Sequence, residues 1–275
     1  MKDVLHDLAT PHLVKSAIKA NWENYHYCLG RAPSVELSIS RYLTWLITNM
    51  PDHFMNLVVC TELPVEGTNE LIENALQHFK SLNIKRLSWL AQAGVPADKI
   101  KSCLLSHGLI FDESFATEMA IDLKVLTDKP PALNGLEIVL VDNPELLRQW
   151  IHIASIGFKV PVEIEDIWFE FFHYAAYTYP FQTYLAFLNG KPVGTSQMFG
   201  SAGVAGIYNV TCIPEARGRG VGTAVVRAPL SNARAMGYGV GILQASSMGY
   251  PVYQRLGFED FGKLSVYLWN QDKTV

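Results

Sequence analysis

The chain has 275 residues, of which 49% are hydrophobic and 17% are charged, with a formal net charge of −4, a composition typical of a globular protein with one large or two small domains. The mild negative charge and the scattered Lys and Arg residues argue against a nucleic-acid partner. No segment is long and apolar enough to span a membrane, and the acidic N-terminus is unlike a signal peptide, so we expect a cytoplasmic protein.

Cysteine and histidine spacing gives no sign of a metal centre. Cys28, Cys60, Cys103 and Cys212 are far apart and form no Cys-x-x-Cys pair, which is typical of reduced, buried thiols. The eight histidines show no metal-ligand spacing such as His-Glu-x-x-His. We therefore expect no metal site.

Two α/β domains are expected, separated by a linker. Residues 128–135 read Asp-Lys-Pro-Pro-Ala-Leu-Asn-Gly, and this sequence breaks both helix and strand. It divides the chain into domains at 1–127 and 136–275. The first domain ends in an alternating stretch at about 115–123, which predicts a strand.

The second half opens with a buried strand at 136–141. Asn143 and Pro144 then supply the cap and the first position of a helix that runs to about residue 156. The elements after it are, in chain order, a helix at about 162–176, strands at 183–188 and 192–199 joined by an Asn189-Gly190 turn, a strand at 205–213, a helix at about 221–236, a strand at 239–246, a helix at 249–256 and a strand at 264–269. Pro229 should bend the helix at 221–236 near Val225, because it removes a hydrogen bond.

A glycine- and arginine-rich loop carries the strongest functional signal. Residues 211–223 read Thr-Cys-Ile-Pro-Glu-Ala-Arg-Gly-Arg-Gly-Val-Gly-Thr. Glycine lets backbone N–H groups face a ligand, a helix N-terminus adds unpaired donors and a partial positive charge, and arginine adds fixed charge. The loop therefore indicates a site for a phosphate or pyrophosphate.

Two well-known phosphate loops do not fit this sequence. A P-loop ends in Gly-Lys-Ser/Thr, whereas this loop ends in Gly-Val-Gly-Thr. A dinucleotide fingerprint needs Gly-x-Gly-x-x-Gly and a later carboxylate, whereas the glycines here alternate and residues 238–245 hold no carboxylate. The pattern Arg-x-x-Gly-x-Gly at Arg217, Gly220 and Gly222, between a strand and a helix, resembles the coenzyme A loop of the GNAT superfamily of N-acetyltransferases.

A second segment, Tyr253-Gln-Arg-Leu-Gly257-Phe258, is similar to the Tyr-x-x-x-Gly-Phe sequence that ends the last core helix of GNAT enzymes. Gly257 fits the left-handed C-cap of that helix. The resemblance implies that the Tyr253 hydroxyl lies near the coenzyme A sulfur and protonates the departing thiolate. The alternative for a lone helical tyrosine is core packing.

The two halves share an order of elements. Residues 61–64 resemble 211–214, and 105–109 resemble 254–258, at nearly the same offset. After Pro64, however, the first half has one glycine, no arginine and two carboxylates, and Leu104 replaces the tyrosine. This resembles tandem GNAT proteins with a degenerate first domain. It implies two GNAT-like domains, each a mixed, mostly antiparallel central sheet flanked by helices, of which only 136–275 binds acetyl-CoA.

The resemblance implies acetyl-CoA as co-substrate and no metal. The strand before the loop would offer backbone groups to the pantetheine arm, the loop would bind the pyrophosphate, and Ser246 stands where many relatives carry a cofactor-contacting asparagine. The implied cofactor-binding residues are Val210, Thr211, Cys212, Ile213, Arg217, Gly218, Arg219, Gly220, Val221, Gly222, Thr223, Ser246 and Tyr253.

The general base is not assigned by the sequence. Many relatives use a glutamate on the strand before the loop, but residues 205–213 hold no carboxylate. Asn209, the candidate catalytic residue of that strand, and Tyr208 could each orient the amine or a water that relays its proton. The aromatic run at 168–181 is either a core helix or the wall of an apolar acceptor pocket. Four acidic residues near it either form a solvated face or border the acceptor site: Glu163, Glu165, Asp166 and Glu170.

The function that the resemblance implies is acetyl-CoA-dependent N-acetylation of a small-molecule or peptide amine, by direct transfer with Tyr253 as general acid, in a monomer or homodimer. A non-catalytic acyl-CoA-binding sensor is the alternative, and the missing strand carboxylate favours it. A third hypothesis makes the first half an interaction module for a protein acceptor.

Overall fold

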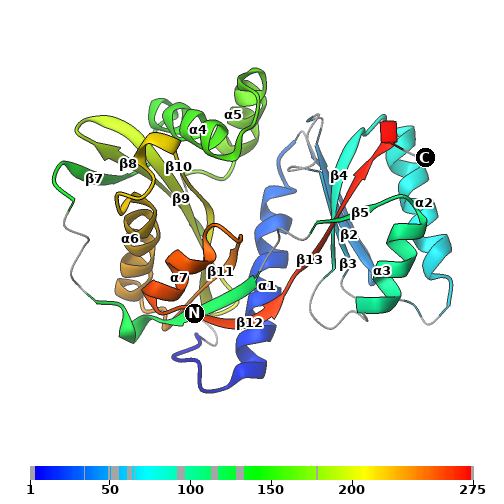
Figure 1. The fold of residues 1–275 in the computed structure, drawn as a ribbon, viewed down its shortest axis with the longest axis horizontal. Helices are drawn as coiled ribbons and strands as arrows, with labels where there is room; N and C mark the ends of the chain where they lie inside the picture. The colour runs from blue at the N-terminus through cyan, green and yellow to red at the C-terminus, as the bar shows by residue number, and fades with distance from the viewer. Residues whose placement is uncertain are drawn as a thin grey trace. The chain divides into compact units, whose positions relative to one another are not determined.

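A computed structural model describes residues 4–33, 35–48, 50, 56–60, 64, 66–91, 97–112, 117–127, 133–177 and 179–273 (Figure 1). The chain forms two compact units. Residues 1–29 and 118–261 make up unit 1, and residues 30–117 and 262–275 make up unit 2. Each unit therefore combines two segments that are separated in the sequence.

Unit 2 is built on a six-stranded mixed sheet. Its strands follow the order β1 (Val35–Ile39), β2 (Leu43–Thr48), β3 (Leu57–Cys60), β4 (Arg86–Ala91), β13 (Ser265–Asn270) and β5 (Ile110–Asp112). β3 and β4 run parallel, whereas β13 is antiparallel to both of its neighbours. The parallel pair is connected through helix α2 (Thr68–Ser81), because parallel neighbours need a crossover.

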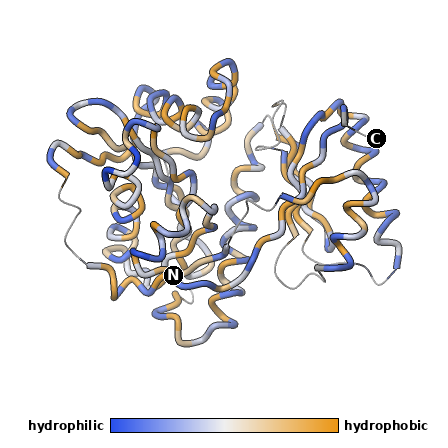
Figure 2. Tube along the Cα trace, viewed as in Figure 1, coloured by the Kyte–Doolittle hydropathy of each residue, from blue (hydrophilic) through white to orange (hydrophobic). Residues whose placement is uncertain are grey.

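Helices α2 and α3 (Ala97–Ser106) pack on the apolar sheet of unit 2. Phe79 of α2 and Leu104 of α3 lie in one buried cluster with Trp89 of β4 and Tyr267 of β13. The central strands of this sheet are coloured mainly as hydrophobic in Figure 2. The cluster therefore joins both helices to one strand from each half of the sequence, β4 and β13.

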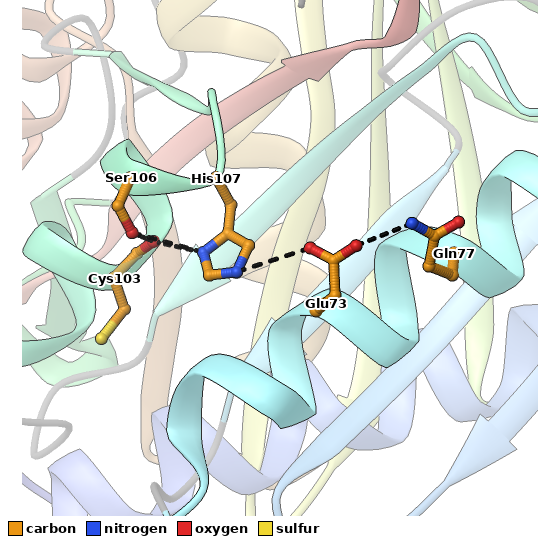
Figure 3. A network of polar contacts seen from close by, with 5 residues as sticks. All are labelled: Glu73, Gln77, Cys103, Ser106 and His107. Carbon is orange, nitrogen blue, oxygen red and sulfur yellow. Dashed lines mark hydrogen bonds and ion pairs between the residues drawn. The ribbon is translucent and has the colours of Figure 1, made fainter.

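A short chain of polar contacts also joins α2 to α3 (Figure 3). The Nε2 atom of His107 lies 3.6 Å from a carboxylate oxygen of Glu73, and the other oxygen of Glu73 accepts a hydrogen bond of 2.7 Å from Gln77. The His107 Nδ1 atom contacts the Cys103 carbonyl at 2.8 Å and the Ser106 hydroxyl at 3.4 Å. Because Glu73 is half exposed, these contacts orient the helices more than they stabilise them.

Unit 1 contains a seven-stranded sheet. Its strands follow the order β12 (Glu259–Lys263), β6 (Thr117–Asp122), β11 (Val240–Ala245), β10 (Val204–Cys212), β9 (Lys191–Ser201), β8 (Phe181–Leu188) and β7 (Leu136–Leu140). β7 to β10 pair antiparallel, and β10 and β11 pair parallel. The Asn189-Gly190 turn between β8 and β9 has φ values of 51° and 77°, as a two-residue hairpin turn requires.

Helices cover both faces of the unit 1 sheet. α6 (Val221–Ala235) and α7 (Tyr250–Leu256) share a buried cluster with Met119 and Ile121 of β6. α1 (Pro11–Leu29) shares another with Ala120 of the same strand and Ile242 of β11. Because successive residues of a strand point to opposite faces, α1 lies on the face opposite α6 and α7. We call the face of the sheet that α1 covers the α1 face.

The final strand of each half lies in the other half's sheet. β6 comes from the first half of the sequence and sits between β11 and β12, while β13 comes from the end of the chain and sits between β4 and β5 (Figure 1). The order β1-β2-β3-β4-β13-β5 therefore matches β8-β9-β10-β11-β6-β12. Two mixed sheets flanked by helices were expected, and this expectation is confirmed.

This exchange means that the compact units do not follow the linear division at 127 and 136. Strands β6 and β13 occupy equivalent positions in the two sheets. The alternating pattern of each segment therefore predicts a strand but not the sheet that it joins. Residues 128–132 of the expected linker lie outside the described residues.

Several local expectations differ from the structure in detail. The helix expected at 162–176 is a 3₁₀ turn at Val162–Ile164 followed by α5 (Glu165–His173). Of the four cysteines, Cys60 is buried, as expected, and Cys28, Cys103 and Cys212 are half-buried. Among the described residues, no helix has the length and apolarity needed to cross a membrane, and no three metal-ligating side chains gather.

Candidate active site

Strands β10 and β11 of unit 1 pair over a short stretch and then separate. Their parallel pairing is confined to Ala205 with Gly241 and Gly206 with Ile242, although β10 continues to Cys212 and β11 to Ala245. Beyond Gly206, the edge of β10 that faces β11 has no ladder partner among the described residues. Its backbone N–H and C=O groups are therefore available to an extended ligand.

A β-bulge in β10 accompanies this separation. Tyr208 pairs with Gln197 of β9, but the next pair is Thr211 with Thr195, so β10 carries one residue more than β9 between them. Asn209 takes up the extra length with a φ of 52°. A bulge bends its strand and increases the local twist, which turns this end of β10 away from β11.

The side chain of Asn209 is held by two polar neighbours. Its Nδ2 atom donates to the Tyr25 hydroxyl at 3.0 Å and to the Gln197 Oε1 atom at 3.2 Å. The backbone carbonyl of Asn209 accepts a hydrogen bond of 2.8 Å from the Thr195 hydroxyl. These contacts fix the bulge, so the structure places Asn209 as a support of β10 rather than as a free group.

Replacing Asn209 by Ala should destabilise the protein by about 1–3 kcal/mol. Alanine at positive φ costs about 1–2 kcal/mol, and the two side-chain hydrogen bonds are lost. Asn209→Gly loses the same bonds without the backbone strain, so it should lose less stability. Urea unfolding of the wild type and both variants measures the difference; equal losses would show that positive φ at this residue is not strained.

Helix α1 supplies two residues beside the bulge. The Tyr25 ring stacks on Tyr208 with centroids 3.9 Å apart, and the Tyr208 hydroxyl donates to Asn21 Oδ1 at 2.8 Å. Burial raises the pKa of both tyrosines well above the ordinary value, so both stay neutral. Gly206 leaves room for this pair, because a methyl group there would collide with Asn21 and the Tyr208 ring.

The glycine-rich loop leads from β10 into α6. Gly218 and Gly220 have φ values of 70° and 91°, which a side chain would oppose. No side chain in the described part of the chain caps α6 at Gly220, so the first N–H groups of the helix are available to a ligand as donors. A methyl group at Gly218, Gly220 or Gly222 would meet no atom within 4 Å. Open space, free donors and the nearby Arg217 and Arg219 make this loop fit an anionic phosphate ligand.

Pro229 does not interrupt α6, which runs from Val221 to Ala235. The proline has no N–H to donate to the Val225 carbonyl. That carbonyl instead accepts a hydrogen bond from the buried Ser196 hydroxyl of β9. The helix therefore continues through the proline and stays attached to the sheet.

Tyr253 lies on α7 beside the parted strands. Burial raises the pKa of Tyr253 to about 12, with a further contribution from Cys212 on β10. Its ring packs against Phe258, 5.9 Å away between centroids, and a methyl group at Gly249 would lie 2.7 Å from a Tyr253 ring carbon. Gly257 ends α7 with a φ of 101°, as the sequence predicts.

Two further candidate residues have partners inside the protein. Burial raises the pKa of the Cys212 thiol, and Arg217 lowers it through charge and a hydrogen bond. The Ser246 hydroxyl accepts a hydrogen bond of 3.2 Å from the Gly249 N–H. Ser246 therefore supports the turn into α7, where Gly249 leaves room for Tyr253.

The acidic residues near α5 lie on its solvent side or bind α4 (Pro144–Phe158). Glu163 and Glu170 are exposed, Asp166 pairs with Arg148 at 3.0 Å, and Glu165 contacts His152 at 3.1 Å. The aromatic residues of α5 are buried, namely Trp168, Phe169, Phe171 and Phe172. This helix therefore packs mainly in the core, which agrees with the interpretation of the aromatic run as a core helix.

Several residues of this region carry no local sequence signal. Asn21 and Tyr25 come from α1, more than 180 positions before the β10 residues that they contact. Glu118 of β6 belongs to the same region, and its charge contributes to the raised pKa of Tyr208. Only the tertiary fold brings these residues to β10, so no local sequence pattern identifies them.

Comparison with known proteins finds one family that matches part of the chain. Residues 143–261 match the family model described as an acetyltransferase (GNAT) domain. No curated protein matches the sequence.

Several solved structures share the fold over most of the chain. A GCN5-related N-acetyltransferase from Kribbella flavida has a TM-score of 0.68 at 17% identity, over 92% of this chain and 95% of that chain. A tandem GNAT protein from the clavulanic acid biosynthesis pathway has a TM-score of 0.62 at 13% identity, over 98% and 97%. A GCN5-related N-acetyltransferase from Sphaerobacter thermophilus has a TM-score of 0.57 at 14% identity, over 95% and 93%. This chain thus carries a GNAT acetyltransferase domain at residues 143–261, in a two-unit arrangement like that of tandem GNAT proteins.

Proposed function

We propose that the chain transfers an acetyl group from acetyl-CoA to the amine of a small molecule or peptide. One observation carries the proposal: the unpaired edge of β10 leads directly into the glycine loop at the uncapped N-terminus of α6. An extended ligand with a pyrophosphate at one end fits this combination of backbone groups and helix donors. Acetyl-CoA would supply an activated thioester.

The backbone of residues 210–213 would hold the pantetheine arm, and the N–H groups of 217–223 would hold the pyrophosphate. Arg217 and Arg219 add positive charge beside those donors. Tyr253 is buried and protonated at neutral pH, and it lies near Cys212 at the open edge of β10. It therefore suits the role of a general acid for the leaving sulfur.

A binding-only sensor remains the second candidate function. The absence of a carboxylate from β10 favours it, whereas the retained Tyr253 favours the enzyme. The two share the same ligand site and differ in turnover alone.

Calorimetric titration with acetyl-CoA, followed by thiol release in a panel of primary amines, tests the proposal. We expect saturable binding and amine-dependent thiol release. Assays without amine correct for thioester hydrolysis. Binding without release for any amine would support the sensor, and the lack of any binding would overturn both candidate functions.

A further inference from the structure

Strand β6 brings a buried carboxylate into unit 1. Glu118 is 8% exposed, and burial raises its pKa above the ordinary value. Lys15 on α1 lowers this pKa through its charge, but burial outweighs it, and no hydrogen bond from a described residue contributes. A buried carboxylate without such bonds is costly, and groups of this kind concentrate at functional sites.

The alternation of β6 directs Glu118 to the α1 face. Met119 and Ile121 pack with α6 and α7, while Ala120 packs with α1, so Glu118 shares the side of Ala120. Tyr208 of β10 lies on this face too, bonded to Asn21 of α1. The charge of Glu118 acts on Tyr208, so the two side chains approach each other across the intervening β11.

Gln244 lies on β11, the strand between Glu118 and Tyr208. Val240 and Ile242 of β11 pack with α1, and alternation places Gln244 on the same face. Its Nε2 atom is shielded from solvent and has no hydrogen-bond partner in the part of the chain that is described. Buried polar atoms normally have partners, so this amide and the Glu118 carboxylate are together suited to a polar ligand.

Glu118, Gln244 and Tyr208 therefore form a polar strip across three neighbouring strands of the sheet. The strip lies where β10 and β11 stop pairing, which is where the proposed acetyl donor would place its reacting end. Strand β10 itself has no carboxylate. The strip thus supplies the group that β10 lacks.

We propose that Glu118 is the general base, which binds the acceptor ammonium group and takes its proton. The inference rests on the proposed acetyl transfer. Glu118 first takes one proton from the ammonium group and releases it to solvent, which leaves the free amine. As the amine nitrogen then forms the new C–N bond, the thioester C–S bond breaks, a second proton passes from nitrogen to Glu118 and the proton of Tyr253 passes to the sulfur. Glu118 then loses its proton to solvent, and Tyr253 regains one from solvent. The strand exchange is then part of the active site, because β6 comes from the first half of the sequence.

The surroundings of Glu118 suit a group that gains and loses a proton. The side chains on the same face as Glu118 are Lys15 from α1, Tyr208 from β10, Gln244 from β11 and Phe261 from β12. Phe261 belongs to the apolar cluster of the α1 face. Of these, Lys15 is exposed and Tyr208 is neutral. A raised carboxyl pKa brings the base closer to the pH at which it works.

The test is Glu118→Gln, assayed with acetyl-CoA and the best amine of the panel across a pH series. We expect kcat/KM to fall about 10²–10⁴-fold near neutral pH, with the affinity for acetyl-CoA unchanged. The loss should shrink as the pH approaches the pKa of the amine, because free amine then needs no base. Glu118→Asp should retain part of the activity.

Glu259→Gln is the matched control, because Glu259 is an exposed carboxylate on β12, the other neighbour of β6. Its activity should equal that of the wild type. If the wild type acetylates an amine and Glu118→Gln does so equally well at every pH, Glu118 is not the base and the proposed function stands. If the wild type acetylates no amine, both proposals fall.

Stability separates a chemical loss from a folding loss. Because the pKa of Glu118 is raised in the folded state, its ionisation opposes folding as the pH rises. Glu118→Gln removes that cost, so its melting temperature should exceed that of the wild type near pH 7, and the gap should shrink toward about pH 4. A variant that is at least as stable as the wild type but catalytically weak has lost the base and not the fold.

Discussion

Replacing Tyr253 by Phe is expected to lower turnover by about 10²–10⁴-fold while leaving the affinity for acetyl-CoA unchanged. Burial raises the pKa of Tyr253 to about 12, so the hydroxyl carries its proton throughout the neutral range and can deliver it to a departing thiolate. Phenylalanine preserves the ring packing against Phe258 and removes only that proton. The expected loss therefore falls on kcat and not on binding.

Tyr250→Phe is the control for this change. Tyr250 lies on the same helix, and its hydroxyl donates to the exposed Asp260 at 2.8 Å. Initial rates of thiol release and calorimetric titrations on both variants make the comparison. Full turnover in Tyr253→Phe would show that another group, or water, protonates the sulfur.

The parts of this site that are continuous in sequence could be predicted. The glycine loop, the cap of α4 at Asn143 and the C-cap at Gly257 depend on residues within a few positions of one another. The Asn143 side chain accepts the Leu146 N–H at 3.0 Å, as its place before Pro144 indicates. Local backbone chemistry determines such features, so the pattern of residue types is enough.

The exchange of β6 and β13 could not be predicted in this way. Both segments alternate, and each sheet offers an equivalent position, so the choice depends on how the whole chain is connected. Glu118 follows from that choice: in the sequence it is one polar residue of an alternating strand, and only its insertion beside β11 brings it near Tyr208. Tyr25 is a similar case, because its role depends on where α1 packs.

The second large expected effect is a loss of acetyl-CoA affinity when the glycine- and arginine-rich loop is changed. Arg217→Glu should weaken acetyl-CoA binding at least tenfold, because a charge-assisted hydrogen bond is worth about 1.5–3 kcal/mol and a carboxylate there repels the pyrophosphate. Gly220→Asp should weaken it further, since Gly220 has a φ of 91° and any side chain strains the start of α6. Arg255→Glu, at an exposed position on α7, makes the same charge change away from the loop.

Calorimetric titration at two salt concentrations distinguishes the causes. If charge dominates, the defect of Arg217→Glu should shrink as salt is added, because exposed charges are screened over about 10 Å at 0.1 M. The defect of Gly220→Asp should persist, because part of it comes from backbone geometry that salt does not change. Arg255→Glu should bind as the wild type does. Unchanged affinity in both loop variants would remove the loop from the site, whereas a defect in Arg255→Glu as large as that in Arg217→Glu would mean that the net charge of the unit, and not the loop, attracts the ligand.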